Sequence, residues 1–286
     1  MRPRVTRPRG ATRSTRASLR GPLALLVAFV ALGIALPFVA PEPGFALRES
    51  FEPPSAAHWL GTADNGVDVL GARARGARLA AFVALVVTGL AVSLGAALGT
   101  WAGYAGGRVD AFVGALMDLL QAFPALVLQV ALLALVERPT LAHLVLALVL
   151  PGWVIYGRLA RAEARTLRTR PFVEAARALG ASTPRVLFRH VGPSLAGPLV
   201  VQATSGIGGV VLAEATLAFL GLGPGSSLAA GEGALAGPSW GALLDQGTAV
   251  LLRFPHVALA SGAAIAATVL AFQLAGDIAR DALDPR

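Results

Sequence analysis

Six long apolar segments, separated by polar or glycine- and proline-rich stretches, follow one another along the chain. A helix that crosses a bilayer needs about 20 mostly apolar residues, and each segment reaches or approaches that length. The pattern therefore predicts an all-α, polytopic membrane protein with six transmembrane helices. The predicted spans are residues 22–40, 77–104, 111–136, 141–157 with a bend at Pro151, 195–222 and 254–276.

Composition agrees with this prediction and narrows the chemistry. The chain is 55% hydrophobic and 14% charged, whereas a soluble domain averages about 25% charged residues. All 24 basic residues are arginines, and the absence of lysine excludes a phosphate-binding loop and a Schiff base. The absence of cysteine excludes disulfides and thiolate metal sites. The histidines are scattered without ligand spacing, so we expect no catalytic site, no metal and no cofactor, which argues against a membrane-embedded enzyme.

The placement of arginines predicts the orientation of the chain in the membrane. With the N-terminus inside, the inner side holds seven arginines in residues 2–20 and eight in residues 158–189. Positive charge is enriched in cytoplasmic loops, so we expect both termini to be cytoplasmic. The arginines left outside are Arg48, Arg73, Arg75, Arg78, Arg138 and Arg253.

The predicted spans and the arginine placement together divide the chain into parts. The apolar core of the first span is longer than the 7–15 residues typical of a signal peptide, which favours an uncleaved anchor. The arginine tail lacks aromatic residues, so we expect it to lie against anionic lipid, at ~1 kcal/mol per arginine, and not to bind nucleic acid. The predicted parts are a cytoplasmic tail (1–21), an anchor span (22–40), an external loop (41–76), a five-helix core (77–276) with a cytoplasmic loop at 161–194, and a cytoplasmic C-terminal tail (277–286).

The stretch EAARALGASTPRVLFRHVGP, residues 174–193, stands out between the fourth and fifth spans. Phe172, Ala175, Ala176 and Leu179 recur at the spacing of one helical face, which predicts a short amphipathic helix. Gly180 follows at the position where helices commonly end in a left-handed residue.

A second short helix is predicted after this glycine. Thr183 is suited to cap it, Pro184 to occupy its first turn, and Pro193 to end it. Such a basic segment could be a connector that rests on lipid headgroups. A DNA-binding helix-turn-helix is disfavoured, because a span lies within a few residues of each end.

The order Glu174, Ala175, Ala176, three residues, Gly180, and Pro193 thirteen residues later resembles the cytoplasmic signature loop of ATP-binding-cassette importer permeases. His190 and Gly192 depart from its usually aliphatic positions. Five further stretches are similar to the dipeptide/oligopeptide/nickel branch, of the second-permease type with an extra N-terminal span. These stretches are HWLGT…GVDVLG, GTWAGYAGGRVDAFVGALMDLLQAFPAL, AEATLAFLGLG with GPSWGALL, and GDIARDALDPR.

This resemblance implies a transport subunit that forms half of a translocation pathway for small peptides, nickel or related solutes. It implies four partners: a second homologous permease subunit, two cytosolic ATPase subunits and an extracytoplasmic solute-binding protein. It also implies that the ATPases dock on the loop. The residues assigned to this coupling are Glu174, Ala175, Ala176, Arg177, Leu179, Gly180 and Pro193.

Polar side chains inside the predicted spans are costly to bury in lipid and therefore suggest function. Asp118 and Gln121 share one helical face beside the kink predicted at Pro124, and we assign them to the pathway lining. A proton-coupled secondary transporter that uses Asp118 or Glu214 is the alternative function. These polar residues could instead face the bundle interior, bond across helices or lie near an interface. The full set is Asp118, Gln121, Gln129, Gln202 and Glu214.

Glycines recur every four residues at the end of the second span. Small residues at this spacing allow two membrane helices to approach closely, or to slide along each other. The stripe consists of Gly95, Gly99, Gly103 and Gly107.

Overall fold

The computed structural model describes residues 20–39, 49–137, 139–223 and 239–283. The predicted tail 1–21 lies almost entirely outside these residues, as do part of the external loop, the loop at 224–238 and the last three residues. Within the described ranges the secondary structure is helical, apart from one isolated bridge between Thr62 and Asp68. The all-α prediction is therefore confirmed for this part of the chain.

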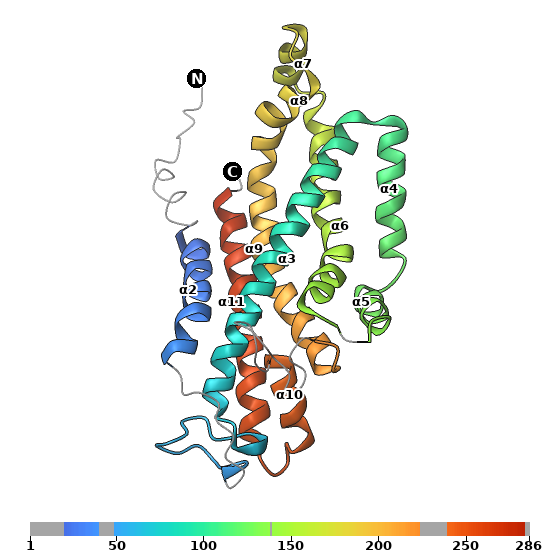
Figure 1. Cartoon of the computed structure of the whole chain (residues 1–286). Helices are drawn as coiled ribbons and strands as arrows, with labels where there is room; N and C mark the ends of the chain where they lie inside the picture. Colours follow the sequence, from blue (N-terminus) through green and yellow to red (C-terminus); the bar gives the residue numbers. More distant parts are fainter. Residues whose placement is uncertain (1–19, 40–48, 138, 224–238, 284–286) are drawn as a thin grey trace, which may run out of the picture.

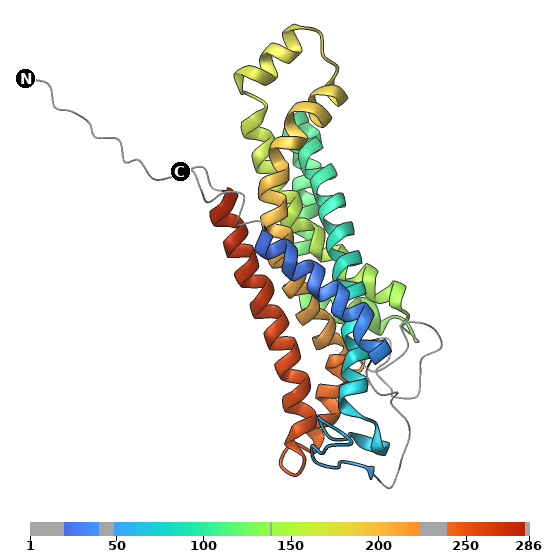
Figure 2. The same cartoon turned by 90° about the vertical axis from the view of Figure 1, so that its left-hand side faces the viewer.

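The helices form a lengthwise bundle. α3, α6, α9 and α11 run along one another, α2 lies against α3 and α11, and α7 and α8 project past one end (Figures 1 and 2). The elements are α2 (Arg20–Val39), η2 (Asp64–Gly66), α3 (Val69–Ala105), α4 (Gly107–Gln121), α5 (Ala125–Ala134), α6 (Leu141–Leu167), α7 (Pro171–Ala178), α8 (Thr183–Val186), the π-helical turn η3 (Leu187–Val191), α9 (Gly192–Phe219), α10 (Trp240–Ala249) and α11 (Pro255–Leu283).

Among the described residues, four helical stretches are long and apolar enough to cross a membrane: Val69–Ala105, Leu141–Leu167, Thr183–Phe219 and Pro255–Leu283. The predicted third span is broken into α4 and α5, which meet at 79° and together would make a fifth. Pro124 lies at this break and accounts for it, because proline lacks an N–H and disfavours helical geometry in the preceding residue. The N-terminal apolar helix α2 is shorter, so the six-helix count stays a prediction.

Three helices extend past the boundaries predicted from hydropathy. α3 begins at Val69, eight residues before the predicted span, because the Asp68 carboxylate accepts a hydrogen bond from the Gly71 N–H at 2.7 Å and caps the helix. α6 continues from 157 to Leu167, and α11 continues to Leu283 through the predicted tail. Arginine and alanine favour helix outside the bilayer as well as within it.

Glycines bring α3 and α6 into backbone contact. A Cβ at Gly95 would lie 2.6 Å from the Trp153 carbonyl oxygen, and Cβ atoms at Gly99 and Gly103 would overlap the next two carbonyls along the facing surface of α6. Gly107 lies outside α3 at φ +56° and has nothing within 4 Å of an added Cβ. Close packing is therefore confirmed for three glycines of the predicted stripe and is wrong for Gly107, because the helix has already ended there.

Candidate functional site

The loop between α6 and α9 begins with the short helix α7. Pro171 occupies the first turn, where its missing N–H is not needed. At the other end, the Gly180 N–H donates to the Arg177 carbonyl at 2.9 Å and the Ala181 N–H donates to the Ala176 carbonyl at 3.0 Å. With Gly180 at φ +82°, this is a Schellman motif. The left-handed cap predicted at Gly180 is confirmed.

The second half of the loop differs from its prediction. α8 is preceded by Ser182 as its N-terminal cap residue, with Thr183 as the first helical residue. Pro193 does not end the helix, because the π-turn Leu187–Val191 joins α8 directly to α9. The Gly192 N–H donates to the Leu187 carbonyl five residues back, and Pro193 then stands in the first turn of α9, where proline is tolerated.

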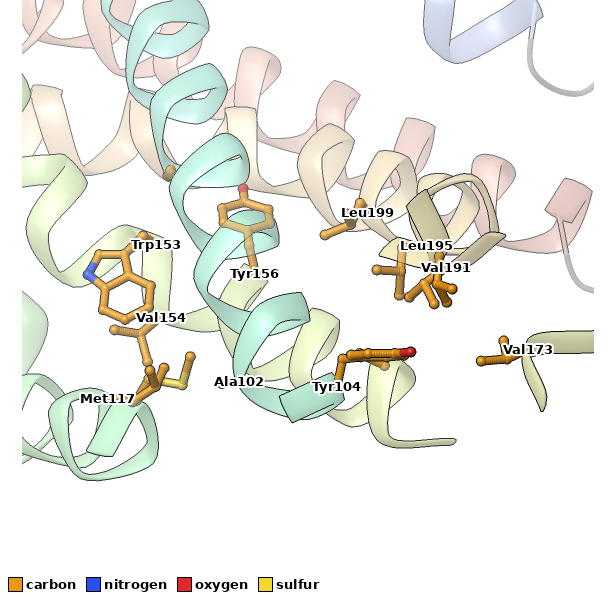
Figure 3. Close-up of a cluster of buried hydrophobic side chains, with 14 residues drawn as sticks. Ala102, Tyr104, Met117, Trp153, Val154, Tyr156, Val173, Val191, Leu195 and Leu199 are labelled. Atoms are coloured by element: carbon orange, nitrogen blue, oxygen red, sulfur yellow. The ribbon is translucent and has the colours of Figure 1, made fainter. Parts of the chain in front are cut away.

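Valines hold the loop to the bundle. Val173, Val186 and Val191 are fully buried and belong to one apolar cluster with Tyr104 and Leu195 (Figure 3). The Arg177 guanidinium carbon lies 5.4 Å from the centroid of the Tyr104 ring, a cation–π distance. The loop is therefore a packed extension of the bundle, seated on the end of α3.

The outward face of the loop carries large apolar side chains. Leu179 is 89% exposed and Phe172 is 45% exposed, although both were predicted on the apolar face of the first helix. Phe188, which was not among the site residues predicted from the sequence, is 85% exposed. The available signal was a large apolar residue directly before Arg189 and His190. Glu174, Ala175, Arg177, Gly180 and Pro193 are exposed as well, and Ala176 is half-buried.

Below the loop, arginines of α6 pair with carboxylates of α4. Arg158, Arg161 and Arg165 lie on one face of α6, since they are three and four residues apart. Arg161 Nε lies 2.6 Å from an Asp110 carboxylate oxygen, Arg165 pairs with the other oxygen, and Arg158 lies 2.6 Å from Asp118. These pairs attach α4 to the helix that leads into the loop.

A pocket of about 420 Å³ lies deeper in the bundle between α3, α5, α6 and α9. Its lining is mostly apolar, with polar groups from Thr88, Gln129, Tyr156, Gln202 and Thr216. Asp118 and Gln121 are not among its lining residues, and the Asp118 side chain is 71% exposed beside Arg158. The structure thus brings two predicted intramembrane glutamines to one pocket and places Asp118 and Gln121 on the exposed part of α4.

Glu214 lies elsewhere in the bundle. It is 1% exposed, and its Oε1 has no hydrogen-bond partner among the described residues. Among all the residues that the structure describes, no group of three or more histidine, aspartate or glutamate side chains could hold a metal ion.

At the opposite end, the segment before α3 is folded against α11. Phe51 stacks on Phe254 with ring centroids 4.9 Å apart, and the His256 ring is hydrogen-bonded to the Thr62 carbonyl oxygen at 3.0 Å. His58 Nδ1 lies 2.8 Å from an Asp68 carboxylate oxygen.

The same histidine has a second acidic neighbour. His58 Nε2 lies 3.5 Å from a Glu49 carboxylate oxygen. The hydrogen bond to Asp68, and then the negative charges of Asp68 and Glu49, raise the pKa of His58 above its ordinary value of 6.5.

The transport-protein family described as "Binding-protein-dependent transport system inner membrane component" matches residues 95–286, about two thirds of the chain. This chain belongs to that family. The match covers the glycine contact of α3, the ion pairs between α4 and α6, the loop, and the pocket apart from its lining residues Val87, Thr88 and Ala91. The segment folded against α11 and the N-terminal helix α2 precede it.

Known members of the family are similar over most of their length. The dipeptide transport system permease protein DppC of Alkalihalophilus pseudofirmus is 34% identical, over 92% of this chain and 84% of its own. The glutathione transport system permease protein GsiD of Pectobacterium atrosepticum is 34% identical, over 90% and 85%. The oligopeptide transport system permease protein OppC of Bacillus subtilis is 33% identical, over 84% and 75%.

The fold has a solved counterpart. An inward-facing structure of the MetNI methionine ABC transporter aligns with 70% of this chain and 93% of its own, with a TM-score of 0.50 and 18% identity. The chain is thus a membrane protein of the ABC importer permease type. Nothing in the comparisons supports the proton-coupled alternative.

Proposed function

We propose that this chain is one permease subunit of an ATP-driven importer for small peptides or related solutes. It forms half of the pathway, and a second homologous permease subunit supplies the other half. Both termini and the α7–α8 loop lie on the cytosolic side of a bacterial inner membrane. The observation that carries the proposal is the outward apolar face of that loop.

This face is suited to a protein partner. Phe172, Leu179 and Phe188 are exposed although Val173 and Val186 anchor the same segment to the bundle. Exposed apolar patches rimmed by polar residues mark interaction sites. Glu174 and Arg177 are exposed on the same short helix and carry opposite charges, which would fix the register of a complex more than they raise its affinity. The assigned occupants are two cytosolic ATPase subunits, one on each permease.

The solute, the solute-binding protein and the pathway residues remain to be assigned. Their names specify dipeptide, glutathione and oligopeptide transport systems, which support a small peptide as the solute. An extracytoplasmic solute-binding protein would deliver it to the end where Phe51 stacks on Phe254. The glutamine-containing pocket between α3, α5, α6 and α9 is a candidate part of the translocation pathway. Asp118 and Gln121 do not line this pocket, and we still propose that they line the pathway in a different conformation of the importer.

Cross-linking from single cysteines tests the docking, because the chain has no cysteine of its own. Leu179→Cys should cross-link to an ATPase subunit in the assembled importer. Leu252→Cys, equally exposed at the far end of the bundle, should not. A Leu179→Cys variant that labels only lipid in the assembled complex would favour a connector resting on headgroups and overturn the proposal.

A functional measurement complements this test. Leu179→Glu should reduce solute-stimulated ATP hydrolysis by about tenfold, since the loss of one central contact of an interface weakens it by roughly that factor. The amount of inserted protein should stay unchanged. Unaltered stimulation would contradict a coupling role for this residue.

A further inference from the structure

A groove on the outside of the bundle runs between α2 and α3. It has a volume of about 410 Å³ and is lined by Val30 and Ile34 of α2 and by Phe82, Leu85 and Arg78 of α3. The helices touch beside it at Gly33, where an added Cβ would lie 3.0 Å from the Ala81 Cβ. The groove is therefore a fixed feature of the contact between the two helices.

Arg78 is the one charged residue in the lining of this groove. Within the part of the chain that the structure describes, no carboxylate pairs with its guanidinium and no hydrogen bond is made to it. A half-buried cation beside apolar side chains is costly unless an anion accompanies it. The groove therefore has complementary chemistry for a molecule with one anionic group and a hydrocarbon chain.

Arg78 lies near the start of α3. It lies nine residues into α3, about 14 Å from the start of the helix, and α2 ends five residues beyond Ile34. Figure 1 places this part of α3 toward the end of the bundle opposite α7. In the proposed orientation, the guanidinium stands at the external interface and the rest of the groove extends into the hydrocarbon.

We propose that this groove binds one anionic phospholipid of the outer leaflet, with its phosphate on Arg78 and an acyl chain along Val30, Ile34, Phe82 and Leu85. Arginine recognises phosphate through two parallel N–H donors, and apolar side chains suit the chain. The volume is within the roughly 300–1,000 Å³ of small-molecule sites. The lipid would fasten α2 to the bundle. The assignment to the outer leaflet rests on the proposed orientation, whereas the lipid site itself does not depend on importer activity.

Native mass spectrometry of the full chain, titrated with phosphatidylglycerol and phosphatidylcholine, tests the site. We expect one tightly retained phosphatidylglycerol. Arg78→Gln should weaken its retention by about fivefold, the factor for one basic contact with an anionic headgroup. Arg75→Gln, three residues earlier and outside the groove, should have no effect. Equal effects of the two variants would overturn the proposal.

Two further measurements separate other occupants of the groove. Ile34→Trp fills the groove and leaves Arg78 in place, so it should also lower retention; unchanged retention would place the lipid elsewhere and overturn the proposal. Inorganic phosphate at millimolar concentration should not displace the lipid, and displacement would indicate a free-anion site. Loss of the lipid when the importer assembles would show that a partner subunit covers the groove, and would also overturn the proposal.

Discussion

Arg161 of α6 is joined to Asp110 of α4 by two hydrogen bonds. Its Nε donates to a carboxylate oxygen at 2.6 Å, and a terminal nitrogen donates to the Asp110 backbone carbonyl at 2.9 Å. The two side chains are only 21% and 14% exposed, and Arg165 adds a second partner to the same carboxylate. This contact fixes the position of α4 against α6.

Asp110→Asn should therefore destabilise the chain in detergent micelles by about 2 kcal/mol, because it removes charged hydrogen bonds from a largely buried arginine. The free energy of unfolding by denaturant measures this. Asp118→Asn is the matched control: its pair with Arg158 is exposed, and the cost should be below about 0.5 kcal/mol. Equal costs at the two positions would show that burial of the Asp110 pair has no influence.

Gly180→Val should disrupt coupling by disturbing the end of α7. Its φ of +82° costs a side-chain-bearing residue about 1–2 kcal/mol, although nothing lies within 4 Å of an added Cβ. We expect solute-stimulated ATP hydrolysis in the reconstituted importer to fall by about tenfold.

Gly180→Asn separates backbone conformation from side-chain bulk. Asparagine tolerates left-handed geometry, and the surroundings leave room for it. This variant should retain most of the activity. If both variants failed equally, the lost feature would be the absence of a side chain rather than the left-handed turn.

Gly99→Ala should lower the stability of the chain by about 2 kcal/mol, because its methyl group would overlap the Gly157 carbonyl on α6 and force the helices apart. Gly89→Ala, on the same helix with nothing within 4 Å, should change stability by less than about 0.5 kcal/mol. The thermal midpoints of the purified variants provide the comparison. A normal midpoint for Gly99→Ala would mean that the two helices tolerate separation.

The segment around His58 should loosen as pH rises. The fold raises the pKa of His58, so the protonated ring is the stabilising form. Its contribution is complete below the ordinary value of 6.5 and is lost as pH passes the raised value. Hydrogen exchange of residues 49–68, corrected for its intrinsic pH dependence, should therefore accelerate as pH rises above 6.5.

His58→Gln should abolish this additional pH dependence. His143→Gln should preserve it, because His143 bonds to Thr140 at the start of α6, elsewhere in the fold. A pH response that survives in His58→Gln would assign the titration to another group.

Features encoded within a few residues were predictable from the sequence. The left-handed turn at Gly180 and the close approach at Gly95, Gly99 and Gly103 depend on local backbone chemistry and spacing. The break at Pro124 follows from the missing N–H of proline. In each case the residue type alone restricts the conformations available to the chain.

Features that join distant residues were not predictable. Hydropathy marks Asp118 as costly to bury, but it does not identify Arg158, forty residues away, as its partner. In α7, apolar residues occur on both sides of a short helix, so periodicity could not decide that Val173 faces the bundle and Leu179 the exterior. The π-turn before Pro193 likewise depends on how α9 packs, because proline alone predicts an end.

The carbonyl-to-glycine contact between α3 and α6 limits how such a protein can move. Two helices that touch through their main chains have almost no side-chain layer between them to repack, so they form a single stiff frame. Any change in the width of the pocket must then come from α5 and α9, which line it from outside that frame. α5 meets α4 at the 79° corner beside Pro124, so a rotation at this corner would change the width of the pocket while α3 and α6 stay in contact.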